Sequence, residues 1–336
     1  LWPEVELPLT PITSITNGVH LPTWISSPLQ DLLDHYLLPD WRHRMQDDDV
    51  WQPVLDIPDE AFWAVLLQNK QTLLTYLLEY TRRRWASGEI DPKQVVAGGP
   101  FLQPQPLTIG FARRFATYKR ATLIFSDPDR LARILTDPAR PVQLIFAGKA
   151  HPADDGGKRL IQEIFWRSLD PRFEGRIAFA EDYDMMLASR LYAGVDVWLN
   201  NPRAPLEASG TSGMKAAANG ALNLSVLDGW WIEGFAANHD AGWGIPPSAL
   251  IESKGDEADA EAIYTALERE VVPLFYERDD RNLPLAWIRM SKAAMRALAP
   301  RFSSQRMVIE YINRLYLPAS EGGARWLAQP VAAGGD

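Results

Sequence analysis

The chain has 336 residues, 46% of them hydrophobic and 23% charged, which is the composition of a folded protein and argues against intrinsic disorder. Its formal net charge of -9 argues against a nucleic-acid groove, and its lack of cysteine excludes disulfides, thiol nucleophiles and cysteine-ligated zinc sites. It contains no apolar run of about 18 residues, so we expect no membrane span, and we expect no metal site either.

The first hundred residues divide into a loop and a helical segment. Residues 1–25 are rich in Pro and Thr, which predicts an interdomain loop. The chain starts Leu1-Trp2-Pro3 without an initiator Met, and we expect it to be a piece of a longer protein. Residues 26–100 carry apolar side chains at helical spacing and predict a helical connecting segment.

Residues 101–300 show short apolar runs that alternate with helical patterns. Buried parallel strands are expected at 107–111, 142–146, 176–180, 195–199 and 221–225, and helices at 118–126, 156–167, 184–193 and 212–219. The alternation predicts an α/β fold with a Rossmann-like, doubly wound sheet, whose ligands bind at the carboxyl ends of the strands. Residues 301–318 predict a final helix capped by Ser303 or Ser304, and residues 319–336 a loose tail.

Four cations fall within eight residues directly after the first expected strand: Arg113, Arg114, Lys119 and Arg120. At a junction between a strand and a helix, such side chains can converge on an anion together with the helix N-terminus. A solvated basic helix start is the alternative, and it stays open.

A second polar loop follows the next strand, in Gly148-Lys149-Ala150-His151. Gly148 would allow close backbone approach, and Lys149 and His151 would face the same crevice. An ordinary loop between a strand and a helix is the alternative, and a catalytic role for His151 is disfavoured.

The segment Glu207-Ala-Ser-Gly-Thr-Ser-Gly-Met-Lys215 sets a carboxylate, hydroxyls, glycines and a lysine within nine residues. Such a segment can cradle a phosphate on backbone N–H groups and present an amine to an aldehyde, although by itself it is also an ordinary turn signal. The chain has neither a G-x-G-x-x-G fingerprint nor a phosphate-binding loop of the G-x-x-x-x-G-K-[ST] type.

Taken together, these blocks resemble a known family. In chain order the blocks are Thr16-Asn-Gly-Val19, Arg113 to Arg120, Gly148-Lys-Ala150, and Glu207 to Lys215 followed by Asn219-Gly220. In this order and rough spacing they are similar to motifs of the α-glucan (glycogen, starch or maltodextrin) phosphorylases. The resemblance covers residues 11 to about 316 and is to the C-terminal half of the compact bacterial and archaeal branch. It implies the C-terminal domain of a two-domain glycosyltransferase of the GT-B type, with an N-terminal domain before Leu1 on which residues 301–318 pack.

The resemblance also implies a role for each matching residue. Lys215 would carry pyridoxal 5'-phosphate, and Gly210, Thr211, Arg113 and Tyr183 would contact the cofactor, with Arg113 in place of the more usual lysine. Arg114 and Lys119 would hold the substrate phosphate, and Glu207, Ser209 and Asn17 the glucosyl hydroxyls.

The activity implied is phosphorolysis of α-1,4-glucans with inorganic phosphate to α-D-glucose 1-phosphate, with retention, in the cytoplasm. The isolated chain is expected to turn over poorly without the N-terminal half. Departures from the animal-type pattern, among them Ala116-Thr117 and Asp184, put nucleotide and phosphorylation control in doubt.

Two other functions stay open from the sequence. One is a nucleotide-sugar-dependent, glucan synthase-type glycosyltransferase, which would need no pyridoxal phosphate. The other is a glucan-binding module in which some of the 13 Trp stack on sugars, although most Trp are expected in the core. The apolar side of the final helix also leaves a homo-oligomer open.

Overall fold

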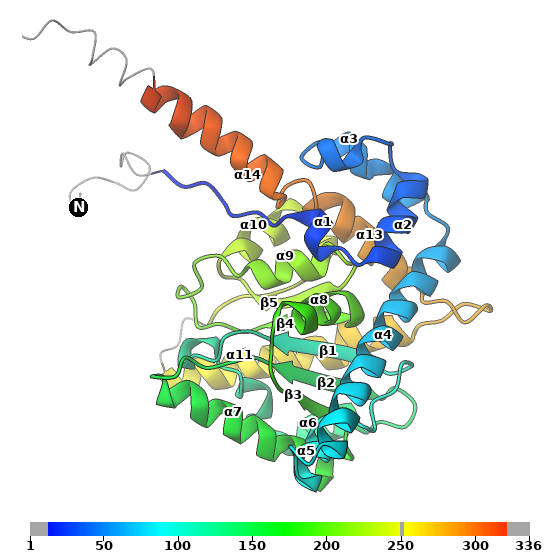
Figure 1. The fold of residues 1–336 in the computed structure, drawn as a ribbon, viewed down its shortest axis with the longest axis vertical. Helices are drawn as coiled ribbons and strands as arrows, with labels where there is room; N and C mark the ends of the chain where they lie inside the picture. The colour runs from blue at the N-terminus through cyan, green and yellow to red at the C-terminus, as the bar shows by residue number, and fades with distance from the viewer. Residues whose placement is uncertain (1–12, 249–251, 321–336) are drawn as a thin grey trace, which may run out of the picture.

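The computed structural model describes residues 13–248 and 252–320 (Figure 1). Its centre is a six-stranded parallel sheet in the order β3-β2-β1-β4-β5-β6. The strands are β1 Leu107–Ala112, β2 Val142–Ala147, β3 Ile177–Ala180, β4 Val197–Asn200, β5 Leu222–Val226 and β6 Gly242–Ile245. This confirms the expected α/β fold with a Rossmann-like sheet.

Helices flank the sheet, and a further group lies above it in the view of Figure 1. Their bounds are α1 Leu21–Trp24, α2 Ser27–Tyr36, α3 Asp48–Trp51, α4 Asp59–Ala86, α5 Pro92–Ala97, α6 Pro128–Leu135, α7 Asp155–Ser168, α8 Met185–Gly194, α9 Thr211–Ala217, α10 Trp230–Ala237, α11 Glu252–Ala266, α12 Val272–Tyr276, α13 Leu285–Leu298 and α14 Ser304–Tyr311. The group above the sheet includes α1, α2, α3 and α13. The expected helices at 156–167, 184–193 and 212–219 correspond to α7, α8 and α9.

Nearly every strand position is buried, because helices cover both faces of the sheet. One core cluster joins Leu73 of α4 and Leu187 of α8 to Ile145 and Trp198 of the sheet. The other face packs on α6, α7 and α11 in a larger cluster that continues into the helical segment before residue 100. Eight Trp side chains are buried in the core, as expected for most of them: Trp41, Trp51, Trp63, Trp198, Trp230, Trp231, Trp243 and Trp287.

The expected helix at 118–126 is wrong. The chain instead forms two short 3-10 turns, Thr117–Lys119 and Leu123–Phe125, followed by α6. Arg120 separates the turns with a left-handed backbone (φ 48°), which an α-helix of L-residues does not accommodate. Its guanidinium donates to the carbonyls of Asn201 (2.9 Å) and Pro202 (2.7 Å), and these contacts hold the residue in this conformation.

The final helix begins beside the segment around Gly18 and Val19. Ser303 caps α14 by accepting from Arg306 N, and the chain continues helically through a widened turn at Ile312–Tyr316. The backbone of Val19 pairs with Phe302 and Ser304, and a Cβ on Gly18 would lie 2.2 Å from the Ser303 carbonyl oxygen. The helix projects from the rest of the chain (Figure 1), no residue of α14 is buried, and Val308 is 47% exposed, so apolar side chains of this helix are exposed.

A buried ion pair fastens the long helix α4 to the sheet. Lys70 Nζ donates to Asp196 Oδ2 at 2.5 Å and to the Pro106 carbonyl at 3.1 Å, and Asp196 also accepts from Thr108 N at 2.7 Å. Burial lowers the pKa of Lys70 and raises that of Asp196, while the attraction between the two groups opposes both shifts. Each charge therefore depends on the other to remain inside the protein.

We predict that Lys70→Met lowers the free energy of unfolding by about 3–5 kcal/mol, because it leaves the Asp196 carboxylate buried and unpaired. Urea denaturation at neutral pH measures this change. Arg82→Met removes an exposed ion pair with Glu79 and is the control, with an expected cost below about 1 kcal/mol. Equal costs for the two variants would contradict the prediction.

Candidate functional site

The candidate site lies where the strand order of the sheet reverses. β1 and β4 are neighbours in the sheet, and the chain leaves them toward opposite sides, so the loops after these strands border the position at which sheets of this kind have their ligand crevice. The loop after β1 is held against the loop after β2, since Phe115 N donates to the Lys149 carbonyl at 2.9 Å. Gly148 (φ 152°) allows this approach, because a Cβ there would lie 2.1 Å from the Arg113 carbonyl oxygen.

Two of the four predicted cations converge on one carboxylate in this crevice. Arg113 Nη2 lies 2.6 Å and Lys119 Nζ 2.8 Å from Glu207 Oε2. Both cations are nearly buried, and the backbone N–H of Glu207 donates to Asp228 Oδ2 at 2.9 Å. The segments around residues 113–119 and 207 are thus joined by two ion pairs, and the predicted contacts of these residues with phosphate and sugar stay predictions.

The guanidinium of Arg113 has hydrogen-bond donors that are not used. Its Nε and Nη1 are buried and have no hydrogen-bond partner among the described residues. Burial lowers the pKa of Arg113, and the charge of Glu207 only partly opposes this effect. Unused buried donors are costly, so the site fits an additional anion with several acceptor oxygens, such as a phosphate group.

The other two cations of the block lie apart from this cluster. Arg120 turns toward α11, where it pairs with Asp256 and Asp259 at 2.8 Å each. Arg114 is exposed, and no hydrogen bond or ion pair of its side chain occurs in the part of the chain that the structure describes. The predicted contact between Arg114 and a substrate phosphate therefore stays a prediction.

The amine of Lys215 lies against two aromatic rings. Its Nζ lies 3.9 Å from the ring centroid of Trp24 and 5.5 Å from that of Tyr192, and within the described residues it has no acidic partner. Burial lowers the pKa of the Lys215 amine. A half-buried amine of lowered pKa is the form that attacks an aldehyde, so this side chain suits attachment of a carbonyl cofactor.

Tyr183 connects these two rings with the cation cluster. Its hydroxyl is 2.9 Å from that of Tyr192, whose ring packs edge-on against Trp24. Burial raises the pKa of Tyr183, and the positive charge of Arg113 opposes this rise. Tyr183 and Tyr192 thus link the surroundings of Lys215 with those of Arg113.

The segment between Glu207 and α9 is shaped by close packing. Gly210 (φ 81°) precedes Thr211 at the start of α9, and a Cβ on Gly213 would lie 2.5 Å from Asn223 Oδ1. Ser209 accepts from Trp230 N through its carbonyl (2.8 Å), while its buried Oγ has no partner within the described ranges. This hydroxyl is a further free group beside the site.

Sequence reasoning missed two residues that organise the site, Trp24 and Tyr192, and assigned no role to a third, Asn219. Asn219 Nδ2 donates to the carbonyls of Trp24 (2.7 Å) and Lys215 (2.9 Å), and its Oδ1 accepts from Ser26 N (2.9 Å). It thereby joins the end of α1 and the start of α2 to α9. Asn219 was visible as part of the motif, but no local pattern indicates that Trp24 would lie beside Lys215.

Asn17 lies beside the first turn of α14, and within the described residues no hydrogen bond or ion pair joins it to the cation cluster or to Lys215. Its side chain is exposed, and its carbonyl accepts from Arg306 Nη2 at 3.1 Å. Exposed His151 accepts from Ala153 N through Nδ1, which is the ordinary loop role that the sequence favoured.

Over residues 13–248 and 252–320, no helix is long and apolar enough to cross a membrane, and no group of His, Cys, Asp and Glu is arranged to hold a metal ion.

Comparison with known proteins agrees with this geometry. A family model described as carbohydrate phosphorylase matches residues 6–238. The chain is 51% identical over 306 residues to a glycogen phosphorylase of Aquifex aeolicus, covering 91% of this chain and 44% of that protein. It is 44% identical over 321 residues to a maltodextrin phosphorylase of Thermococcus litoralis (95% of this chain, 37% of that protein) and 41% identical over 327 residues to a glycogen phosphorylase of Mycobacterium tuberculosis (97% and 37%). The chain thus spans less than half the length of these curated relatives.

We predict that the Lys215 amine reacts with small aldehydes at a lower pH than free lysine, whose pKa is about 10.4. A lowered pKa leaves more neutral amine at any pH below that value, so the modified fraction should rise earlier on the pH scale. Reductive methylation across pH 6–11, read by peptide mass spectrometry, measures the midpoint. A midpoint at or above that of a lysine-containing model peptide would contradict the prediction.

Proposed function

Since the chain belongs to the carbohydrate phosphorylase family, we propose that it forms the cofactor- and phosphate-binding half of an α-glucan phosphorylase. The whole protein would convert α-1,4-glucans and inorganic phosphate to α-D-glucose 1-phosphate with retention. The single observation that carries this proposal is the half-buried amine of Lys215, linked through Tyr192 and Tyr183 to a buried guanidinium, that of Arg113, with unused donors. Relatives named glycogen and maltodextrin phosphorylase support the substrate class.

The residues present fit pyridoxal 5'-phosphate. Lys215 offers the amine that binds its aldehyde, the rings of Trp24 and Tyr192 form an apolar wall, and the orphaned donors of Arg113 suit its phosphate. Gly210 and Thr211 would contact the same phosphate from the start of α9. When bound, the cofactor would supply a phosphate group that exchanges a proton with the substrate phosphate.

The protein's own task is to hold two phosphates close together. Two unit charges 4 Å apart repel by about 4 kcal/mol at an effective dielectric constant of 20, and phosphates carry more than one charge. Lys119 and Arg113 offset this repulsion from inside the crevice, and we assign Arg114 to the substrate phosphate at its exposed rim. Glu207 keeps the two buried cations side by side through a shared oxygen.

We assign the glucosyl hydroxyls to Glu207, Ser209 and Asn17. The unused buried hydroxyl of Ser209 and the exposed amide of Asn17 supply a donor and an acceptor each. A complete sugar site would need the half of the relatives that this chain does not span, so turnover by the isolated chain is expected to be poor. The cytoplasmic location and a homo-oligomer also remain predictions.

We predict that the chain, incubated with pyridoxal 5'-phosphate and reduced with borohydride, carries a pyridoxyl group on Lys215. Peptide mass spectrometry locates the modification, and Lys215→Met should abolish it while the other lysines remain unmodified. The assay is run alone and with the N-terminal half of a close relative. A folded chain without this adduct under both conditions would overturn the proposal and favour a nucleotide-sugar-dependent glycosyltransferase.

We predict that Arg113→Met weakens cofactor binding about tenfold or more, because the buried guanidinium is removed from the phosphate. Arg113→Lys is the matched control, since a lysine keeps one cation at this place and should lose less affinity. Equilibrium dialysis against pyridoxal 5'-phosphate, with pyridoxal as a ligand that lacks the phosphate, separates the effects. Equal losses for both ligands would show that Arg113 does not act on the phosphate.

A further inference from the structure

A second concave surface lies outside the candidate site. An open groove of about 440 Å³ runs between α5 and α7, and its lining includes Lys93, Gln94, Lys158, Gln162, Trp166 and Glu181. It shares no residue with the cluster of Arg113, Lys119, Glu207 and Lys215. The α5–α7 groove is therefore a surface separate from the cation cluster and the cofactor lysine.

The most prominent feature of the α5–α7 groove is the side chain of Trp166. This residue is 51% exposed, whereas eight other Trp side chains are buried in the core. Its indole is fixed in orientation by Phe165, edge-on at 5.4 Å, and by Lys93, whose Nζ lies 5.1 Å from the ring centroid. A large aromatic ring held in place at a groove is a low-entropy platform for an amphipathic ligand.

Polar side chains continue from this ring along one face of α7. Lys158, Gln162 and Trp166 follow one another at four-residue spacing and so line a stripe about 12 Å long. Gln162 makes no hydrogen bond within the described structure, so its amide is available as both donor and acceptor. A ligand with alternating hydroxyl groups and C–H faces matches this stripe.

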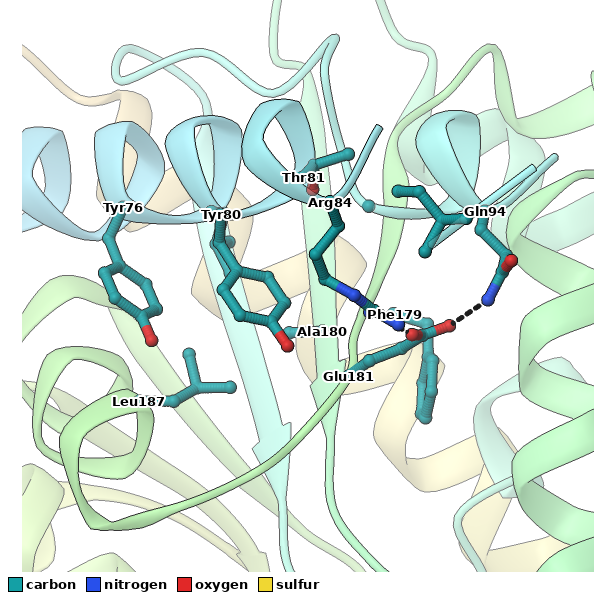
Figure 2. Close-up of a pocket in the computed structure, with 12 residues that line it drawn as sticks. Tyr76, Tyr80, Thr81, Arg84, Gln94, Phe179, Ala180, Glu181 and Leu187 are labelled. Atoms are coloured by element: carbon teal, nitrogen blue, oxygen red, sulfur yellow. Dashed lines mark hydrogen bonds and ion pairs between the residues drawn. The ribbon is translucent and has the colours of Figure 1, made fainter. Parts of the chain in front are cut away.

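The charges of the groove are already balanced. Lys158 pairs with Asp155 at 3.0 Å, and Glu181 accepts from Gln94 Nε2 at 3.0 Å and pairs with Arg84. Figure 2 shows Arg84 and Gln94 converging on the Glu181 carboxylate from α4 and α5. With two cations (Lys93, Lys158) and two acids (Asp91, Glu181) in its lining, the groove favours a neutral ligand over a phosphate or a polyanion.

We propose that the α5–α7 groove is a second carbohydrate site that holds a neutral stretch of α-1,4-glucan, stacked on Trp166 and hydrogen-bonded to Gln162. The identity of the sugar rests on the proposed function, while the neutral, amphipathic character of the ligand rests on the groove alone. The first turn of α7 lies against the loop that carries Arg113, since a Cβ on Gly157 would lie 2.6 Å from the Phe115 carbonyl oxygen. A chain anchored in the groove would thus raise the local concentration of glucan near the candidate site.

Affinity electrophoresis of the full chain in gels that contain soluble glycogen tests this proposal. Trp166→Ala should weaken retardation about tenfold or more, and Gln162→Ala should weaken it to a smaller extent. Trp85→Ala is the matched control, because Trp85 is equally exposed (51%) and lies outside the groove lining. Retardation that Trp166→Ala leaves unchanged would overturn the proposal.

Three further measurements distinguish a neutral glucan in the groove from a sugar bound elsewhere, an anion or a second copy of the chain. Maltoheptaose should protect Trp166 from hydroxyl-radical oxidation in the Glu207→Ala variant as well, and protection that disappears in this variant would assign the sugar to the candidate site instead.

Protection should persist at 0.5 M NaCl, because a neutral ligand is bound; loss in salt would indicate an anion and contradict the proposal. Concentration-dependent protection without sugar, with a larger sedimentation coefficient, would assign the groove to a second copy of the chain and also overturn it.

The proposed function can fail independently of this inference. Trp166→Ala should leave the borohydride-trapped adduct on Lys215 unchanged. An absent adduct together with glycogen retardation that depends on Trp166 would refute the cofactor proposal and keep the carbohydrate groove. A normal adduct on Lys215 without retardation that depends on Trp166 would keep the cofactor proposal and refute the carbohydrate groove.

Discussion

Burial of positive charge at the switch point of the sheet is the constraint on which the rest of the site depends. Arg113 and Lys119 are almost removed from water, and one carboxylate, that of Glu207, lies between them. Burying a guanidinium with unused donors costs free energy unless an anion binds it. The surrounding structure keeps this arrangement in place through tight backbone contacts at Gly148 and through the clamp of Arg120 on the loop after β4. A site held in this way is organised before its ligand arrives.

The surroundings of Lys215 favour a neutral amine, whereas those of Arg113 and Lys119 hold charged groups. Lys215 has aromatic neighbours and, among the described residues, no acid as a partner, so its neutral form is favoured, whereas arginine retains its charge even when buried. Tyr183 and Tyr192 lie between the two environments. The same separation of roles extends to the Trp residues: most fill the core, Trp24 covers the lysine, and Trp166 stays half-exposed above the groove.

Local sequence patterns predicted elements well where burial alone decides them. The five expected strands agree with the structure to within two residues, because parallel strands covered on both faces are continuous apolar runs. β6 was missed since Gly242 and Gly244 interrupt its apolar pattern, and these glycines are needed there because a Cβ would meet Asn223 or Phe235. The helix expected at 118–126 failed because Arg120 makes contacts with residues 201, 202, 256 and 259, which lie far along the chain.

The sequence by itself determined the fold class, the family and the blocks from which the site is built. Those features depend on residue type and short spacing, which are written in the chain. Only the tertiary structure decided that Arg113 and Lys119, and not Arg114 or Arg120, share Glu207, and that Trp24 and Tyr192 enclose Lys215. The direction of a side chain depends on the backbone conformation and on partners distant along the chain, such as Glu207, which lies 94 residues from Arg113 and 88 from Lys119. Neither can be read from a local pattern.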